Sequence, residues 1–292
     1  MGTVWGISAG RGNARFGLGP STLATGLLPV RAGCPTLRVV ISRLARPAVL
    51  IPLAIALVLV GLGAWWLYRA GSSTQVSEEQ AARDYGAGGA ATPAGAPKAG
   101  VWTYTARGDE TVGTGPLAID RELPPEARVV VRPAPDGYWR TLALSEEHVE
   151  ASRLRAEPRG EYLVERVTTL KVAGVGRDDR EVLKPPPLAY PRSIEVGDTW
   201  TERYMMDKVR VVTRVRVLRS APVKVGGRDV PTVIIEKLGK VSGPVGGYRN
   251  DRLWWSDDLK MPVRWVISTK LDGFGSLRTD ADLRLAQLEP TG

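Results

Sequence analysis

Residues 208–219, KVRVVTRVRVLR, alternate between small apolar and basic side chains along most of their length. In an extended strand, successive side chains point to opposite faces of the sheet. One face of this stretch carries Val209, Val211, Thr213, Val215 and Val217, and the other carries Lys208, Arg210, Arg214 and Arg216. One buried face and one solvated face are typical of an antiparallel sheet. The stretch therefore predicts a β-strand in a sheet of that kind.

Shorter stretches of similar composition lie on both sides of this strand. β-Branched and aromatic residues dominate residues 101–107, 128–132, 138–142, 161–172, 252–256 and 262–271, as expected for strands. Gly226 and Gly227 form a two-residue hairpin signal, and residues 184–187, KPPP, interrupt the pattern. After residue 100 only residues 145–149 resemble a helical turn. The expected fold is mainly β, with an antiparallel sheet over residues 101–289.

Residues 47–68, PAVLIPLAIALVLVGLGAWWLY, carry no charge and are flanked by Arg46 and Arg69. A helix of this length spans about 30 Å, the thickness of the hydrocarbon core of a bilayer. More basic residues precede the segment closely than follow it, which places the N-terminus in the cytoplasm. A cleaved signal peptide is the main alternative, but its apolar region is usually only about 7–15 residues long. A buried core helix is a further alternative. We expect an uncleaved single-pass transmembrane helix.

The rest of the chain divides around that helix. Residues 1–46 are expected to be a cytoplasmic tail without regular structure, or the product of an over-extended start site. Residues 69–100 are rich in Ala, Gly and Pro, a composition that cannot bury a core, and are expected to be a linker. Residues 101–289 then form an extracytoplasmic domain tethered to the cell membrane.

Composition argues against several classes of function. Seven of the 40 basic residues precede Ser72, which leaves 33 basic against 31 acidic residues in the remainder of the chain. Nucleic-acid binding requires a surplus of positive charge on the folded part, so no nucleic-acid partner is expected. The single cysteine, Cys34, precedes the apolar segment, and the single histidine, His148, lies near a turn. We therefore predict no disulfide in the outer domain, no metal site and no cofactor.

Tryptophan and basic side chains supply the candidate binding residues. Trp254 and Trp255 are adjacent, so in a strand they point to opposite faces, and one of them is available to line a groove. The predicted ligand-binding residues are Trp200, Trp254, Trp255 and Trp265. The basic face formed by Lys208, Arg210, Arg214 and Arg216 is a candidate for contact with anionic lipid headgroups or cell-wall polymers. The alternative for that face is a solvated surface with acidic partners on neighbouring strands, and we favour this alternative.

The order of these motifs resembles a known type of sheet. VGDTW (196–200), the long basic strand, VKVGGRDVPTVII (223–235) and LWWSDDLKMPVRW (253–265) resemble the curved, half-barrel-like antiparallel sheet of the lipoprotein-carrier (LolA-like) kind. They also resemble uncharacterised single-pass membrane proteins of actinobacteria with an extracytoplasmic β domain. The resemblance covers residues 100–288. It implies that the concave face of the sheet shelters acyl chains.

The function expected from the sequence is non-enzymatic binding at the cell envelope, with lipid or an acyl chain as the ligand. The main alternative is a structural module that docks another envelope protein, and the third is an envelope hydrolase that uses His148. A Ser–His–acid arrangement is disfavoured because residues 101–289 contain a single histidine and no Gly-x-Ser-x-Gly motif, and His148 is expected at the surface. A deep apolar cavity would favour lipid binding. A flat aromatic patch would favour docking of another protein, and a polar cleft around His148 would favour hydrolysis.

Overall fold

The computed structural model describes residues 55–63, 65, 71–86, 93, 95–115, 118–172, 175–273 and 275–291. Residues 55–63 are helical, but the rest of the predicted transmembrane segment lies almost entirely outside the described residues. Among the residues that are described, no helix has both the length and the hydropathy needed to cross a membrane. The predicted tail, residues 1–46, also lies outside them.

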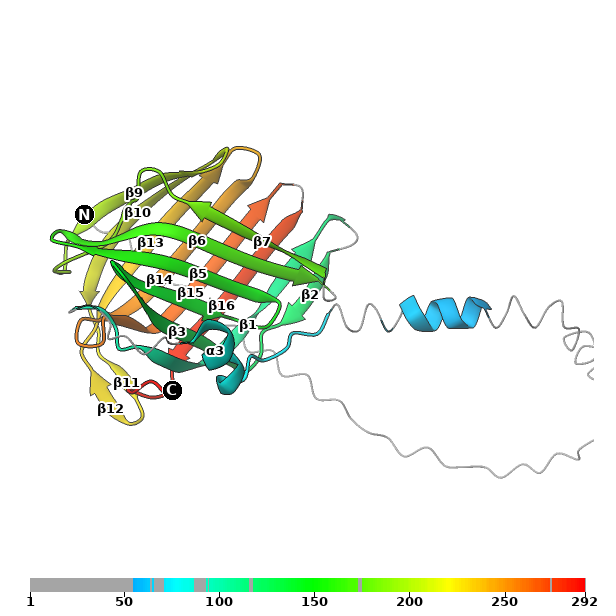
Figure 1. Cartoon of the computed structure of the whole chain (residues 1–292), viewed down its shortest axis with the longest axis horizontal. Helices are drawn as coiled ribbons and strands as arrows, with labels where there is room; N and C mark the ends of the chain where they lie inside the picture. The colour runs from blue at the N-terminus through cyan, green and yellow to red at the C-terminus, as the bar shows by residue number, and fades with distance from the viewer. Residues whose placement is uncertain are drawn as a thin grey trace, which may run out of the picture. The chain divides into compact units, whose positions relative to one another are not determined.

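The described part of the chain from residue 71 onward is mainly β, as predicted (Figure 1). It begins with one short helix, α3 (Glu78–Tyr85). The first strands are β1 (Gly100–Gly113), β2 (Ile119–Glu122), β3 (Glu126–Ala134), β4 (Gly137–Ala143), β5 (His148–Glu157), β6 (Gly160–Val172), β7 (Val175–Val182) and β8 (Leu188–Pro191). The later strands are β9 (Thr199–Met206), β10 (Val209–Ser220), β11 (Val223–Val225), β12 (Arg228–Val230), β13 (Val233–Ser242), β14 (Gly246–Ser256), β15 (Met261–Asp272) and β16 (Ser276–Leu285).

One antiparallel sheet contains all of these strands except β11 and β12. Its order is β7-β6-β5-β4-β3-β1-β16-β15-β14-β13-β10-β9, with β2 paired to β1 and β8 paired to β6. Strands β11 and β12 form a separate hairpin across Gly226 and Gly227, as predicted. Both glycines have positive φ, 54° and 82°, as a two-residue type I′ turn requires.

The sheet is curved and nearly closed, because its two ends approach each other. β7 and β9 are the last strands of the order. The chain between them contains β8, which pairs with β6, and Lys184, which forms an isolated bridge with Met205 of β9. The segment 184–187, predicted only as an interruption of the strand pattern, therefore lies where the ends of the sheet meet. In Figure 1, β5, β6 and β7 cross the strands β13 to β16.

The alternation predicted for residues 208–219 is present in β10. Val211, Thr213, Val215 and Val217 are buried on the concave face. The intervening basic side chains are exposed on the convex face. The same period of two in the other strands places most of the buried apolar side chains on the concave face, where they form the main core.

A second, smaller core lies under α3, so the folded domain begins earlier than the predicted boundary at residue 101. Ser77 caps the helix by accepting a hydrogen bond from the backbone N–H of Gln80, a preferred N-cap interaction. Val76 and Ala81 are buried against β1, β3, β4 and β5. The interpretation of the whole of 69–100 as a linker is therefore too broad. Val76 immediately precedes the N-cap residue, and Ala81 lies in the second turn of the helix. Both apolar side chains pack on the sheet.

Leu253→Ala will test the assignment of the concave face as the core. Leu253 is 1% exposed, whereas Leu238 on the neighbouring strand is 43% exposed. Truncating a buried leucine leaves a cavity and typically costs about 2–5 kcal/mol, so we expect Leu253→Ala to lower the free energy of unfolding by that amount in a urea titration. The control Leu238→Ala should change it by less than about 0.5 kcal/mol. Equal losses would place the core elsewhere.

Candidate functional site

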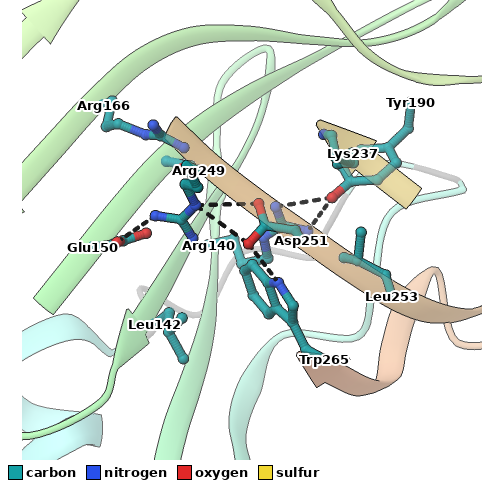
Figure 2. Close-up of a pocket in the computed structure, with 11 residues that line it drawn as sticks. Arg140, Leu142, Glu150, Arg166, Tyr190, Lys237, Arg249, Asp251, Leu253 and Trp265 are labelled. Carbon is teal, nitrogen blue, oxygen red and sulfur yellow. Dashed lines mark hydrogen bonds and ion pairs between the residues drawn. The ribbon is translucent and has the colours of Figure 1, made fainter. Parts of the chain in front are cut away.

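Charged side chains occupy the middle of the concave face. They surround a cavity of about 40 Å³ (Figure 2), called the interior cavity below. Six of the residues that line it are of charged types: Arg140, Glu150, Arg166, Lys237, Arg249 and Asp251. Such residues are seldom buried unless they are paired, so their partners decide what the cavity can do.

The strand period explains how charges reach the interior. Arg249, Asp251 and Leu253 occupy alternate positions of β14, so their side chains share the concave face. Arg140 and Leu142 alternate in the same way on β4. In both strands the charged residues precede apolar ones on the same face, so one strand contributes both to the cavity wall and to the main core.

Arg249 is bonded to two carboxylates. Its Nη1 donates to Glu150 Oε1 at 2.5 Å, and its Nε donates to Asp251 Oδ2 at 3.1 Å. Burial opposes the guanidinium charge, but the two carboxylates outweigh it and raise the pKa of Arg249. Burial likewise opposes the Glu150 carboxylate, but Arg249 and His148 lower the pKa of Glu150 well below its usual range. These groups are therefore charged at neutral pH.

Lys237 forms a second buried pair, with Glu202 of β9. The distance from Lys237 Nζ to Glu202 Oε1 is 2.5 Å. Burial disfavours the ammonium charge, but Glu202 prevails and raises the pKa of Lys237. The ammonium also lies 5.0 Å from the centre of the Tyr190 ring, within the range of a cation–π contact.

Arg140 has a neutral partner. Its Nη1 and Nη2 both donate to the Tyr190 hydroxyl, each at 3.2 Å. The guanidinium also lies 5.3 Å from the centre of the Tyr190 ring and 5.6 Å from that of Trp265. Arg140 is 9% exposed. Its positive charge is thus held by an aromatic hydroxyl and two ring faces.

His148 extends the buried charges toward β1 and β2, and it is 2% exposed rather than at the surface as predicted. His148 and Glu150 alternate along β5 and therefore both point to the concave face. The prediction of a surface position relied on the nearby turn instead. His148 Nδ1 and Glu110 Oε1 are 2.9 Å apart, and Arg121 Nη2 donates to Glu110 Oε2 at 3.1 Å. Burial opposes the imidazolium, but the Glu110 carboxylate dominates, and the pKa of His148 rises to about 9.

A second hollow, of about 340 Å³, lies near the β11–β12 hairpin and is called the apolar hollow below. Its walls are formed by Ile194, Ser220, Pro222, Asp229, Pro231, Thr232, Val233, Trp255 and Asp257. Trp255 stacks on Tyr190 with ring centres 4.4 Å apart and planes inclined by 17°. Because Tyr190 lines the interior cavity, this stacked pair lies between the two hollows.

The four predicted tryptophans do not converge on one site. Trp255 lines the apolar hollow and Trp265 lines the interior cavity. Trp200 is half-buried on the concave side of β9, and its indole nitrogen has no hydrogen-bond partner among the described residues. Trp254 lies on the opposite face of β14, where the Arg264 guanidinium is 4.4 Å from its ring centre. The prediction that Trp254 and Trp255 point to opposite faces is confirmed.

The basic face of β10 lies apart from both hollows. The side chains of Lys208, Arg210, Arg214 and Arg216 are exposed on the convex surface. Arg216 faces Glu236 in register on β13, but the carboxylate of Glu236 pairs with Arg252. Contact of this face with anionic lipid headgroups or cell-wall polymers stays a prediction.

Sequence reasoning missed the charged wall of the interior cavity. A signal was present in residues 249–255, RNDRLWW, where Arg249 and Asp251 share the period of Leu253 and Trp255. A charge in step with buried positions indicates either a buried ion pair or a functional site. No comparable signal identifies Tyr190, whose role depends on how β8 meets distant strands.

Comparison of the chain with protein-family models, curated proteins and solved structures finds no match. The structure shows a curved antiparallel sheet. Any closer relation to carrier-like proteins stays a prediction. Within the described ranges, no group of three or more His, Cys, Asp and Glu side chains is placed to hold a metal ion.

Stability is expected to depend on pH through His148, the single histidine of the chain. Its folded pKa of about 9 exceeds the ordinary value of about 6.5, so the stabilisation is complete below about pH 6.5. It is lost as the pH rises through 9, with a total of up to about 3 kcal/mol. We expect the free energy of unfolding, measured in urea, to fall over this window. In His148→Gln it should be nearly flat, and an unchanged slope would contradict the assignment.

Proposed function

We propose that the chain is a membrane-tethered, non-enzymatic binding protein of the cell envelope that shelters the apolar chain of a lipid-like ligand. The observation that carries the proposal is the apolar hollow beside Trp255, whose volume is about 340 Å³. Pockets for small ligands have volumes of roughly 300–1,000 Å³ and are mostly apolar with a few polar groups. The apolar hollow fits that description.

The hollow differs in position from the site that the carrier resemblance implies. The concave face is filled by core side chains and by the charged residues around the interior cavity. At about 40 Å³ that cavity has room for a few water-sized groups and none for an acyl chain. The ligand chain is therefore assigned to the apolar hollow, at the end of the sheet marked by the β11–β12 hairpin.

Side chains of two kinds suit the apolar hollow to an amphipathic ligand. Half-buried Ile194 and Val233 supply apolar surface, and contact with them contributes roughly 25 cal/mol for each Å² removed from water. Trp255, which is 2% exposed, forms part of the wall. Asp229 and Asp257 also line the hollow. Their carboxylates suit hydroxyl or amine groups at the polar end of a ligand, since carboxylates are hydrogen-bond acceptors.

Residues 47–68 are the proposed membrane tether. Their length and lack of charge suit a bilayer, and the arginines before them favour a cytoplasmic N-terminus. On this proposal the sheet domain works outside the cytoplasm at the cell membrane, within reach of lipid.

The contacts of His148 support a binding role over a hydrolytic one. The ring nitrogens face the carboxylates of Glu110 and Glu150, at 2.9 Å and 3.3 Å. Ser145 accepts a hydrogen bond from the backbone N–H of His148, not from its ring. A catalytic serine would have to contact the imidazole itself.

Native mass spectrometry of the full-length chain, purified in a mild detergent, tests the proposal. We expect an added mass that organic extraction identifies as lipid. Ser220→Trp places a bulky ring in the apolar hollow without removing a buried side chain, so it should reduce the bound fraction at least about fivefold. Ser242→Trp, at another exposed serine, should leave it unchanged.

Two results would overturn the proposal. One is a lipid-free mass that persists after incubation with vesicles of phosphatidylglycerol and phosphatidylethanolamine. The other is equal lipid retention by Ser220→Trp and Ser242→Trp. The thermal unfolding midpoint of each variant is measured as a control. If both midpoints lie within about 2 °C of the parent, a loss of bound lipid reflects the filled hollow and not unfolding.

A further inference from the structure

We propose that the interior cavity is a binding site for an oxyanion of carboxylate or phosphate type, held between Arg140 and Arg166. The site is separate from the apolar hollow, and the inference does not depend on the function proposed above. It is carried by the cross-strand geometry, the charge balance and the unused hydrogen-bond donors of the cavity wall.

Arg140, Ser152 and Arg166 form one row across three neighbouring strands. Arg140 of β4 lies opposite Ser152 of β5, and Ser152 lies opposite Arg166 of β6. All three side chains line the interior cavity, and Figure 2 shows Arg140 and Arg166 directed toward its centre. Directly opposed residues have Cβ atoms about 4.5–5.5 Å apart. Two arginines thus flank one serine in this row of the sheet.

The charges of the cavity wall do not balance. Arg140, Arg166, Lys237 and Arg249 contribute four positive charges, whereas Glu150, Asp251 and the Glu202 partner of Lys237 contribute three negative charges. Glu150 and Asp251 are both bonded to Arg249. None of the ion pairs formed among the described residues includes Arg140 or Arg166. Glu181, which faces Arg166 in register on β7, makes no such pair with it.

Hydrogen-bond donors on the same two arginines remain available. A guanidinium carries five N–H donors and no acceptor. The two terminal nitrogens of Arg140 share one neutral hydroxyl, that of Tyr190. The Nε of Arg166 is buried and has no hydrogen-bond partner in the described structure. Guanidinium groups bind carboxylate and phosphate oxygens through paired N–H donors.

Carboxylates act on these two cations only from beyond ion-pair distance, Glu161 on Arg140 and Glu150 on Arg166. A cation removed from water is stabilised by a counter-ion in direct contact, and a bound oxyanion would supply that contact. The volume of about 40 Å³ admits a group of carboxylate size and excludes large ligands. Ser152 and the Tyr190 hydroxyl are placed to add neutral hydrogen bonds.

Thermal unfolding of the full-length chain in detergent provides the test. The midpoint is measured against sodium acetate and sodium phosphate, each compared with sodium chloride at matched ionic strength. A ligand that binds only the folded state raises the midpoint in a saturable way. We expect such a rise with at least one of the two oxyanions. The apparent dissociation constant should be at least about tenfold weaker in both Arg140→Gln and Arg166→Gln.

Arg252→Gln is the matched control, because Arg252 lies on the convex face, half-exposed and paired with Glu236. It should keep the parent's dissociation constant. Equal responses to oxyanions and chloride would overturn the site, and so would the same dissociation constant in Arg166→Gln as in Arg252→Gln. Arg140 is hydrogen-bonded to Tyr190 and faces two aromatic rings, so Arg166→Gln keeps the test valid if Arg140→Gln fails to fold.

A third arm distinguishes the source of the anion. Titration with hexadecanoate is compared with acetate in the parent and in Ser220→Trp. If hexadecanoate binds no more tightly than acetate, and Ser220→Trp has no effect, the site serves a small free anion. If hexadecanoate binds at least tenfold more tightly and loses this gain in Ser220→Trp, the anion is the head of a ligand whose chain reaches the apolar hollow. Both outcomes retain the oxyanion site, and only the second requires the proposed function.

Discussion

The ion pair between Glu150 and Arg249 is the contact on which the interior of this sheet depends. β5 and β14 lie far apart in the strand order, yet a carboxylate oxygen of one is 2.5 Å from a guanidinium nitrogen of the other. The pair therefore spans the concave space and joins opposite walls. Removing one member of such a buried pair typically costs about 3–5 kcal/mol, because the other charge is left without compensation. Curvature and interior charge are thus coupled, since Glu150 of β5 reaches Arg249 of β14 only if the sheet curves enough to bring these distant strands together.

Tyr190 connects this charged interior to the closure of the sheet. It lies on β8, the short strand that pairs with β6 where the two ends of the sheet approach. Its hydroxyl accepts hydrogen bonds from Arg140, its ring faces Lys237, and the same ring stacks on Trp255. One aromatic ring therefore contacts two cations and the wall of the apolar hollow. A shift of β8 would change the solvation of both cations and the shape of the hollow together, which ties both candidate sites to the same structural element.

The fold was more predictable from sequence than the site, for a physical reason. Alternation in residues 208–219 is a local property, and it correctly predicted an antiparallel strand with basic side chains outside. The positive φ of Gly226 and Gly227 and the opposed directions of Trp254 and Trp255 follow from equally local rules. Sheet closure, the inward position of His148 and the pairing of Glu150 with Arg249 depend on contacts between distant strands. Local patterns do not specify such contacts, and the boundary at residue 101 was misplaced because α3 is stabilised by packing on the sheet.

The overall charge of the chain also concealed the chemistry of its interior. From Ser72 onward the chain carries 33 basic and 31 acidic residues, a balance that argues against long-range attraction of anions. Recognition inside a cavity depends instead on the few charges that line it, because attraction is much stronger where water is excluded. Arg140 and Arg166 face inward while many acidic side chains lie on the surface, for example Asp257 and Glu289. A domain close to neutral can therefore enclose a local positive excess, and the location of each charge carries more functional information than their sum.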